Sequence, residues 1–273
     1  MRKSSFLLSL TLSLPVAVAA GVPLQAQQRH GGGGGGWCND YHSDRSRVRV
    51  CEVRQETLPA DRDVIAVDGR ANGGIIVTGW DRNEILVEAR VSAWGRTEVD
   101  AEDLMATIEI DYGNTIRAMG PRTRRRSSWS VSYHIFAPNE SNLRLESTNG
   151  GIHITEISGN IDFETTNGGV DLYAVSGDVR GRTTNGGVNI ELHGDSWDGA
   201  GLDVRTTNGG VHITVPDNYS AHLETSTVNG GMRIDFPITV QGRIGRSLST
   251  DLGNGGQTIR ATTTNGGVEI RRN

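Results

Sequence analysis

Hydrophobic and polar residues alternate along the second half of the chain in a pattern that recurs six times around an Asn-Gly-Gly triplet. Counted from each asparagine, the positions six, four and two before it and three and five after it are apolar or small almost throughout. The positions between them are polar. Alternation with a period of two is typical of β-strands that turn one face to a core and the other to solvent.

The repeats are regularly spaced, and the first three asparagines lie 18 residues apart. Self-similarity at such a period predicts stacked coils, each of which buries its apolar face against its neighbours. We therefore expect an all-β fold, a parallel β-solenoid or β-roll of about 18-residue coils with a less regular N-terminal β cap. The repeat asparagines would form an internal ladder at one corner, where Gly-Gly supplies the turn; they are Asn149, Asn167, Asn185, Asn208, Asn229 and Asn265.

A competing interpretation is a meander of antiparallel hairpins, because Asn-Gly between apolar runs is a strong hairpin signal. We favour the solenoid because a second turn signal, at Ser158-Gly159 and Ser176-Gly177, divides each unit into two short strands. An 18-residue unit accommodates two strands, or three if they are short, so the number per coil stays open.

One polar column supports in-register stacking of the coils. Five residues before the asparagines, charges alternate in sign at most steps along the series Arg144, Asp162, Arg180, Asp203, Glu224 and Arg260. Parallel strands about 4.8 Å apart would bring these opposite charges together. Each exposed pair contributes only about 0–1 kcal/mol, so we expect them to set register more than stability.

The N-terminal half divides into several segments. Basic Arg2 and Lys3 precede an apolar run, Phe6 to Ala20, which predicts a signal peptide over 1–26 with cleavage between 20 and 26. Residues 27–36 are a glycine-rich linker and 37–58 a disulfide-closed segment. We expect the cap over 60–142, with strands at 64–67, 74–77, 84–91, 107–110 and 130–135, and the solenoid over 143–273.

Export agrees with charge and cysteine content. Removal of Arg2 and Lys3 takes the formal charge from −5 to −7, which favours solubility over binding of nucleic acid. Cys38 and Cys51 are the only cysteines, and in an exported chain we expect them to form a disulfide. We see no later membrane span, and expect a periplasmic, cell-surface or secreted protein.

The run Thr165-Thr166-Asn167-Gly168-Gly169-Val170-Asp171-Leu172 and the earlier Gly73-Gly74-Ile75-Ile76-Val77-Thr78-Gly79-Trp80-Asp81 resemble a bacterial "putative adhesin" domain family of unknown function. The resemblance covers roughly residues 60–273. It implies an exported or membrane-tethered β-solenoid with no assigned catalytic residues, which agrees with the repeat pattern.

Catalytic and metal sites have little support in the sequence. His153 and His212 share an outward column with Asp171 and Glu269, a mixed polar surface for which solvation is the simpler explanation. Asp162, Glu164 and Asp171 raise the idea of a carbohydrate-cleaving site, but neighbouring arginines indicate ion pairing instead. Calcium-binding β-rolls need a recurrent aspartate after Gly-Gly, which this chain lacks. We expect no catalytic residue, metal or cofactor.

Two features are candidates for partner contact. The basic run Arg122 to Arg126, with Arg124, Arg125 and Arg126, could hold an anionic polymer such as lipopolysaccharide or polyphosphate, although a solvated loop is the simpler interpretation. Among the tryptophans that could stack on sugar rings, Trp197 is the best candidate for exposure. It lies in the first of two insertions, 193–201 and 242–257, where a solenoid often binds partners.

We therefore expect an exported, non-enzymatic, adhesin-like binding module for an unknown surface ligand. The alternative is a periplasmic structural or regulatory partner of envelope proteins, associating through the cap or through the edge left by Val268-Glu269-Ile270. A carbohydrate-active enzyme is a remote third possibility.

Overall fold

The computed structural model describes residues 37–38, 47–122, 126–235 and 245–273. The chain divides into two compact units, Met1–Gly34 and Gly35–Asn273, and every described residue belongs to the second. The expected signal peptide and glycine-rich linker lie outside the described residues, as do 39–46 of the disulfide-closed segment.

Two ten-stranded sheets make up the described unit. Sheet A runs in the order β1 (Val48–Pro59), β4 (Glu84–Gly95), β7 (Ser128–Pro138), β3 (Ile75–Trp80), β9 (Ile152–Thr155), β11 (Val170–Tyr173), β13 (Val188–Glu191), β15 (Val211–Val215), β20 (Val268–Arg272) and β17 (Met232–Ile234). Sheet B runs β18 (Ser247–Leu252), β16 (Ala221–Asn229), β19 (Thr258–Asn265), β14 (Gly201–Asn208), β12 (Ser176–Asn185), β10 (Ser158–Asn167), β8 (Leu143–Ser147), β2 (Ile65–Asp68), β6 (Thr115–Met119) and β5 (Glu109–Asp111).

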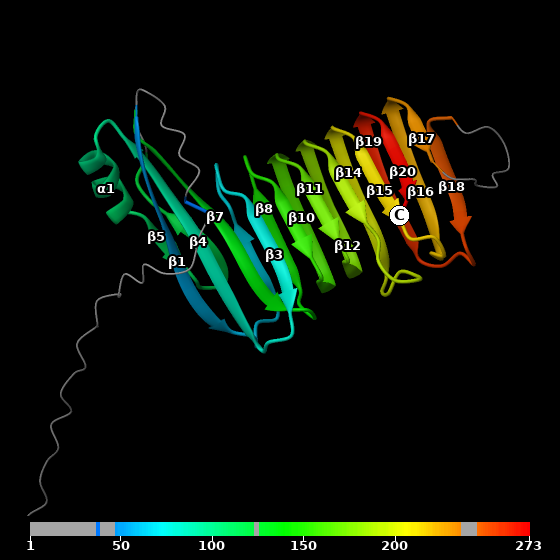
Figure 1. Cartoon of the computed structure of the whole chain (residues 1–273), viewed down its shortest axis with the longest axis horizontal. Helices are drawn as coiled ribbons and strands as arrows, with labels where there is room; N and C mark the ends of the chain where they lie inside the picture. The colour runs from blue at the N-terminus through cyan, green and yellow to red at the C-terminus, as the bar shows by residue number, and fades with distance from the viewer. Residues whose placement is uncertain (1–36, 39–46, 123–125, 236–244) are drawn as a thin grey trace, which may run out of the picture. The chain divides into compact units, whose positions relative to one another are not determined.

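Each solenoid coil contributes one strand to each sheet, so the coil has two strands. The chain leaves sheet B at the Asn-Gly-Gly corner and enters sheet A, as the neighbouring strands in Figure 1 illustrate. Pairing between coils is parallel and in register, so Asn167 lies opposite Asn185 and Val170 opposite Val188. The predicted β-solenoid is confirmed, and the hairpin meander is excluded.

The five inward columns form the core between the sheets. Their large aliphatic members, such as Leu143, Ile161, Val188 and Ile213, are at most 2% exposed. Burying a side chain of this size contributes about 1.5–3 kcal/mol before conformational entropy is counted. In the coil farthest along sheet A, Met232 and Ile234 are only half-buried, because β17 has a strand on one side only.

The order of the last two coils is inverted relative to the sequence. The final strands β19 and β20 lie between the β14–β15 coil and the β16–β17 coil. β16 is flanked on its other side by antiparallel β18. The expectation that Val268-Glu269-Ile270 leaves an open edge is therefore wrong, since β20 pairs with β15 and β17.

The cap departs from the regular pattern. β4 pairs antiparallel with β1 and β7, and β3 continues the parallel stack onto β9. The cap also holds a helix, α1 (Glu98–Ala106), which the sequence analysis did not predict. Only Ala101 and Met105 are buried along α1, too few for an apolar stripe, and its start is fixed by a capping box between Thr97 and Asp100.

Candidate functional site

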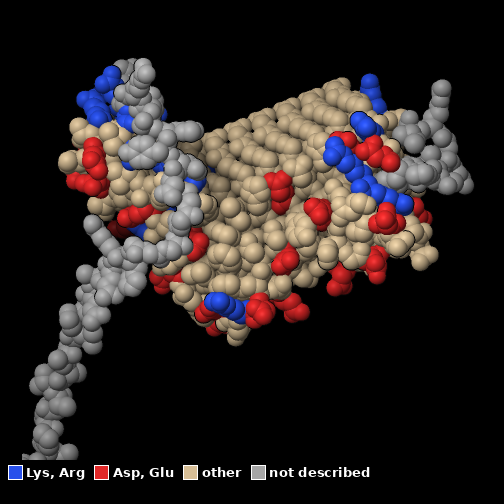
Figure 2. Space-filling view, in the orientation of Figure 1, with Lys and Arg blue, Asp and Glu red and all other residues tan. Residues whose placement is uncertain are grey.

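The repeat asparagines form a hydrogen-bonded ladder along one corner of the solenoid. Each side-chain amide donates to the carboxamide oxygen of the neighbouring coil, for example Asn185 to Asn167 at 2.7 Å and Asn265 to Asn208 at 2.7 Å. At its N-terminal end Asn149 donates to the backbone oxygen of Ala71. The asparagines are exposed, so the ladder lies on the surface and not inside the coil. Figure 2 shows the uncharged, regularly ridged surface along this corner.

A second ladder lies just inside the first. The buried serine or threonine two residues before each asparagine donates its hydroxyl to a glycine carbonyl of the adjacent coil, as in Thr165 to Gly150 at 2.9 Å and Thr183 to Gly168 at 2.8 Å. The coils approach so closely here that a Cβ at Gly168 would lie 2.1 Å from the Gly150 oxygen. The repeat motif therefore serves turn geometry and coil-to-coil bonding.

The charged column on the outer face of sheet B forms ion pairs in its C-terminal part. Arg260 contacts Glu224 at 2.5 Å and Asp203 at 3.4 Å, because β19 lies between β16 and β14. The inverted coil order thus removes the contact between Asp203 and Glu224 that stacking in sequence order would create. A further pair joins Arg182 to Glu164 at 2.7 Å.

The first insertion is an exposed loop over 193–196 and 198–200, but its Trp197 is buried, and the second insertion adds a strand to sheet B. Trp197 is 6% exposed, and its indole N–H donates to the carbonyl of Gly177 at 3.0 Å. Its large apolar surface is covered by the adjoining coil, so the side chain does not offer an exposed ring for stacking. In the second insertion, 247–252 form β18 of sheet B, whereas 242–244 lie outside the described residues.

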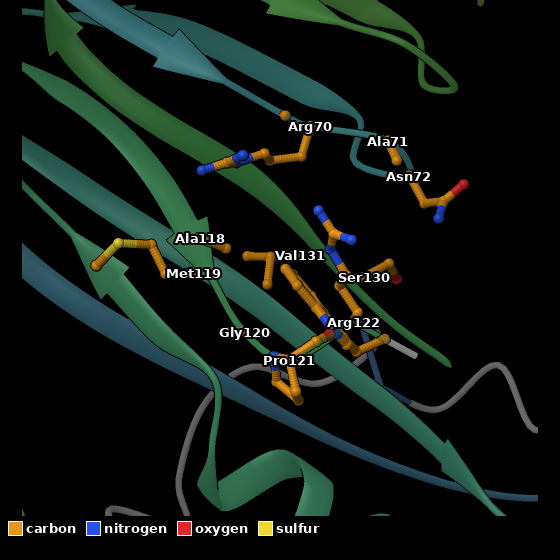
Figure 3. A pocket seen from close by; sticks show the side chains of 12 residues that line it. Arg70, Ala71, Asn72, Ala118, Met119, Gly120, Pro121, Arg122, Ser130 and Val131 are labelled. Atoms are coloured by element: carbon orange, nitrogen blue, oxygen red, sulfur yellow. Dashed lines mark hydrogen bonds between the residues drawn. The ribbon is translucent and has the colours of Figure 1, made fainter. Parts of the chain in front are cut away.

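The basic run borders a hollow of about 580 Å³ at the N-terminal end of the Asn ladder. Its walls come from the β2–β3 turn, the end of β6 and the start of β7; they are Gly69, Arg70, Ala71, Asn72, Ala118, Met119, Gly120, Pro121, Arg122, Trp129, Ser130 and Val131. Figure 3 shows the Arg70 and Arg122 side chains entering the hollow from two different segments. Arg126 is exposed nearby in sequence, and Arg124 and Arg125 lie outside the described residues.

The two arginines of the hollow differ in their partners. Arg70 lies in the left-handed region at φ 54°, with its backbone N–H bonded to Asp68 Oδ1 and its guanidinium 3.7 Å from Asp68 Oδ2. Arg122 makes no ion pair or hydrogen bond with any residue in the described part of the chain. Trp129 borders the hollow and donates its indole N–H to the carbonyl of Pro121 at 2.9 Å. The hollow combines an apolar wall, an indole and a guanidinium that has no partner among the residues that the structure describes.

Aromatic rings also gather on the outer face of sheet A in the cap. Trp80, Phe136, His134 and Trp37 follow one another with ring centroids 5.4, 4.1 and 5.9 Å apart. Arg82 covers Trp80 at 4.8 Å, and Arg90 lies 5.3 Å from the Trp37 ring. Burial lowers the pKa of His134, and its Nε2 lies 3.1 Å from Thr78 Oγ1. Because the rings contact one another, this row packs as a small outer core.

The disulfide between Cys38 and Cys51 is present and joins this row to β1. It holds Trp37 beside β4, where Arg90 donates to the Trp37 carbonyl at 3.0 Å.

The outward histidines of sheet A are paired with carboxylates. His153 Nδ1 lies 2.7 Å from Asp171, and His212 Nδ1 lies 3.1 Å from Glu269. Within the described ranges, no group of three or more His, Cys, Asp or Glu side chains is arranged to hold a metal ion. Nor does any helix described for this chain have the length and hydropathy needed to span a membrane.

Sequence reasoning identified Arg122 and its neighbours but not Arg70, Met119 or the hollow. Arg70 lies about fifty residues before Arg122, and only the pairing of β2 with β6 brings their segments together. The available local signal was the degenerate repeat at Asn72-Gly73-Gly74, which marks a corner without showing what stands beside it.

Comparison with known proteins adds a family and several structural likenesses. Residues 127–271, just over half of the chain, match the family described as Toastrack DUF4097. A "putative cell adhesion protein" from Clostridium sporogenes is similar with a TM-score of 0.48 and 10% identity, over 82% of this chain and 100% of that one. A "putative adhesin" from Bacteroides fragilis has a TM-score of 0.39 and 12% identity, covering 81% and 97%. No curated protein matches the chain.

Proposed function

Since the chain belongs to the Toastrack DUF4097 family, whose description names no activity, we propose that it is an exported, non-enzymatic binding module. The membership confirms the resemblance seen in the Asn-Gly-Gly runs. The solenoid supplies a rigid support, and the hollow at its cap end makes the contact. Its ligand is an anionic polymer, bound through phosphate or carboxylate groups.

One observation carries this proposal: Arg122 enters the hollow without a partner among the described residues. On the solenoid, arginines such as Arg182 and Arg260 contact carboxylates within 4 Å. A guanidinium that borders an apolar wall and Trp129 is suited to hold phosphate or carboxylate by paired hydrogen bonds. The volume of about 580 Å³ falls in the usual range for a ligand site.

The export part of the proposal is supported by the N-terminal sequence and by the disulfide. Disulfides persist in oxidising compartments and are rare in the cytosol. Protease added to intact cells, with a periplasmic protein as control, tests the side of the envelope. Cleavage while the control stays protected supports a surface module, and protection until permeabilisation argues against adhesion.

The binding test compares Arg122→Ala with wild type, using inorganic polyphosphate and a lipopolysaccharide as separate probes. We expect wild type to bind at least one probe and Arg122→Ala to bind it about tenfold more weakly, because a charge-assisted contact contributes about 1.5–3 kcal/mol. Arg246→Ala is the matched control, since Arg246 is exposed and its side chain makes no hydrogen bond or ion pair with a described residue. Equal weakening in both variants, or no binding by wild type, overturns the proposal.

A second candidate function, association with envelope proteins, is favoured by β17. This three-residue strand ends sheet A and, among the described strands, pairs only with β20, so one edge of its backbone has no described partner. An open edge can accept a strand from another chain. Capture of a defined envelope protein by wild type, lost when Ile234, whose backbone N–H faces away from β20, is replaced by Pro to block edge pairing, would favour this function over ligand binding.

A further inference from the structure

The outer face of sheet A carries a second hollow, about 480 Å³ in volume, over β11, β13, β15 and β20. It is built from two outward columns of the repeat. One contributes Asp171, Asn189, His212 and Glu269, and the other Tyr173, Glu191, Thr214 and Arg271. These columns lie in the solenoid, whereas the basic hollow belongs to the cap, so the two sites are independent.

The large side chains of Tyr173 and Arg271 stand at the two ends of this hollow, and those of Glu191 and Thr214 lie between them. Tyr173 on β11 and Arg271 on β20 are separated by three strand spacings, roughly 14 Å. Thr214 lies between them on β15. A gap of this length accommodates a sugar ring with its substituents.

Tyr173 supplies an apolar surface at one end. It is one of the few exposed large hydrophobic residues among those described, at 40% exposed, and its ring is tilted 45° to that of His193 with centroids 6.4 Å apart. An aromatic ring with an exposed face and a polar tip can pack against the C–H face of a pyranose.

Two carboxylates of the hollow are held in fixed orientations. Asp171 is held by His153 on one side and by Asn189 Nδ2 on the other. Glu269 is held by His212 at 3.1 Å and by Arg271 at 2.9 Å. The Glu191 side chain makes no hydrogen bond or ion pair with a described residue. The carboxylates can accept hydrogen bonds from sugar hydroxyls, and the amide can donate to them. Because Asp171 and Glu269 are already held in place, they bind without first reorganising.

Charge narrows the class of ligand. Three carboxylates, those of Asp171, Glu191 and Glu269, line the hollow against the one guanidinium of Arg271. An anionic ligand would meet net repulsion there. We propose that this hollow binds a neutral hexose unit of a glycan, with Tyr173 stacking on the ring and Glu191, Asn189 and Thr214 bonding its hydroxyls. The proposal goes beyond anion binding at the cap and assigns a second site with a different chemistry.

Saturation-transfer NMR on the full mature chain tests this proposal. The probes are glucose, galactose, mannose and their linear oligomers, with glucuronate and glucosamine as charged comparisons. We expect transfer to at least one neutral hexose or oligomer. The dissociation constant should rise about tenfold or more in Tyr173→Ala and in Glu191→Gln, and change little in Tyr173→Phe.

Two controls separate the site from general effects. Thr155→Ala alters the column of Tyr173 outside the hollow and should leave hexose binding unchanged. Arg122→Ala should also leave it unchanged, so failure of the anion site and failure of this site are distinguishable. The proposal is overturned by the absence of neutral hexose binding at millimolar concentration, by binding of glucosamine or glucuronate alone, or by unchanged binding in both Tyr173→Ala and Glu191→Gln.

Discussion

The ring of Phe163 occupies the space that a side chain at Gly181 would fill in the next coil. The two residues are opposite one another in β10 and β12, and a Cβ at Gly181 would lie 2.2 Å from the ring. The inward column is therefore packed by a large residue beside a residue with no side chain. Neighbouring coils are complementary in volume, although they repeat the same motif.

Gly181→Ala should lower the free energy of unfolding by about 1–3 kcal/mol, the usual cost of overpacking a core. Phe163→Ala should cost about 3–5 kcal/mol through the cavity that it leaves. In the double variant the new methyl group enters that cavity, so the combined loss should be smaller than the sum of the single losses. Urea denaturation of the four proteins measures the coupling, and additive losses would show that the two positions do not share space.

Asn185→Ala should lower the free energy of unfolding by about 1–2 kcal/mol, because it removes one hydrogen bond to Asn167 and one from Asn208. Thr184→Ala is the control, since Thr184 is exposed and makes no side-chain hydrogen bond with a described residue. Thermal melts of both variants and of wild type measure the two losses of stability. A similar loss in the control would mean that the exposed ladder contributes nothing specific.

Arg260→Glu should place three carboxylates in succession along the outer face of sheet B. It removes contacts with Asp203 and Glu224 and replaces them with repulsion, so we expect the free energy of unfolding to fall. The loss should shrink in high salt, because the groups are partly exposed and screened. Arg246→Glu carries the same charge change at an exposed position, and an equal, salt-independent loss there would contradict the pairing argument.

Trp197→Ala should cost about 3–5 kcal/mol, as for other large buried side chains, and should leave polyphosphate and hexose binding intact in the folded protein. Trp197→Phe restores part of the lost volume and should recover part of the stability. Calorimetry combined with the binding titrations distinguishes this structural role from partner contact. Loss of binding with unchanged stability would restore Trp197 as a contact residue.

Tyr219 should make the fold sensitive to alkali. Burial raises the pKa of Tyr219 from 10.0 to about 12, and the side chain is 3% exposed. Between these values the unfolded chain has lost the phenolic proton and the folded chain keeps it, so stability falls as pH rises from 10 to 12. Two pKa units correspond to about 2.7 kcal/mol.

Tyr219→Phe should remove this part of the alkaline loss and leave the pH dependence of stability below pH 10 unchanged. Chemical denaturation at several pH values above 9 measures the slope. An unchanged slope in the variant would assign the alkaline loss to other groups.

The repeat made most of the solenoid predictable. Five columns of apolar or small side chains, at fixed positions around each asparagine, alternate with polar positions. In the structure these five columns are buried between the stacked coils. The stacking order was not predicted, because every coil offers the same backbone edges to its neighbours. The charged column five residues before each asparagine did indicate the stacking order. Stacking in sequence order would set Asp203 beside Glu224, and the structure places Arg260 between them.

The cap and the sites were less predictable for a different reason. α1 buries only Ala101 and Met105, so its periodicity was invisible. Arg70 and Arg122 meet through the pairing of β2 with β6, which no local pattern encodes. The basic run and the outward polar column are visible in the sequence. The hollows that they line are not, because each hollow depends on which side chains of neighbouring strands stand next to one another.

Because the order of the last two coils is inverted, the coils are synthesised in one order and stacked in another. A repeat protein can usually grow by adding each new unit to the exposed end of the units already folded. Here the β16–β17 coil leaves the ribosome before the β19–β20 coil that must lie beneath it. The β14–β15 coil therefore gains its neighbour only when residues 258–272 have been synthesised. Premature termination shortly before residue 258 would remove a coil from the interior of the stack and not from its end.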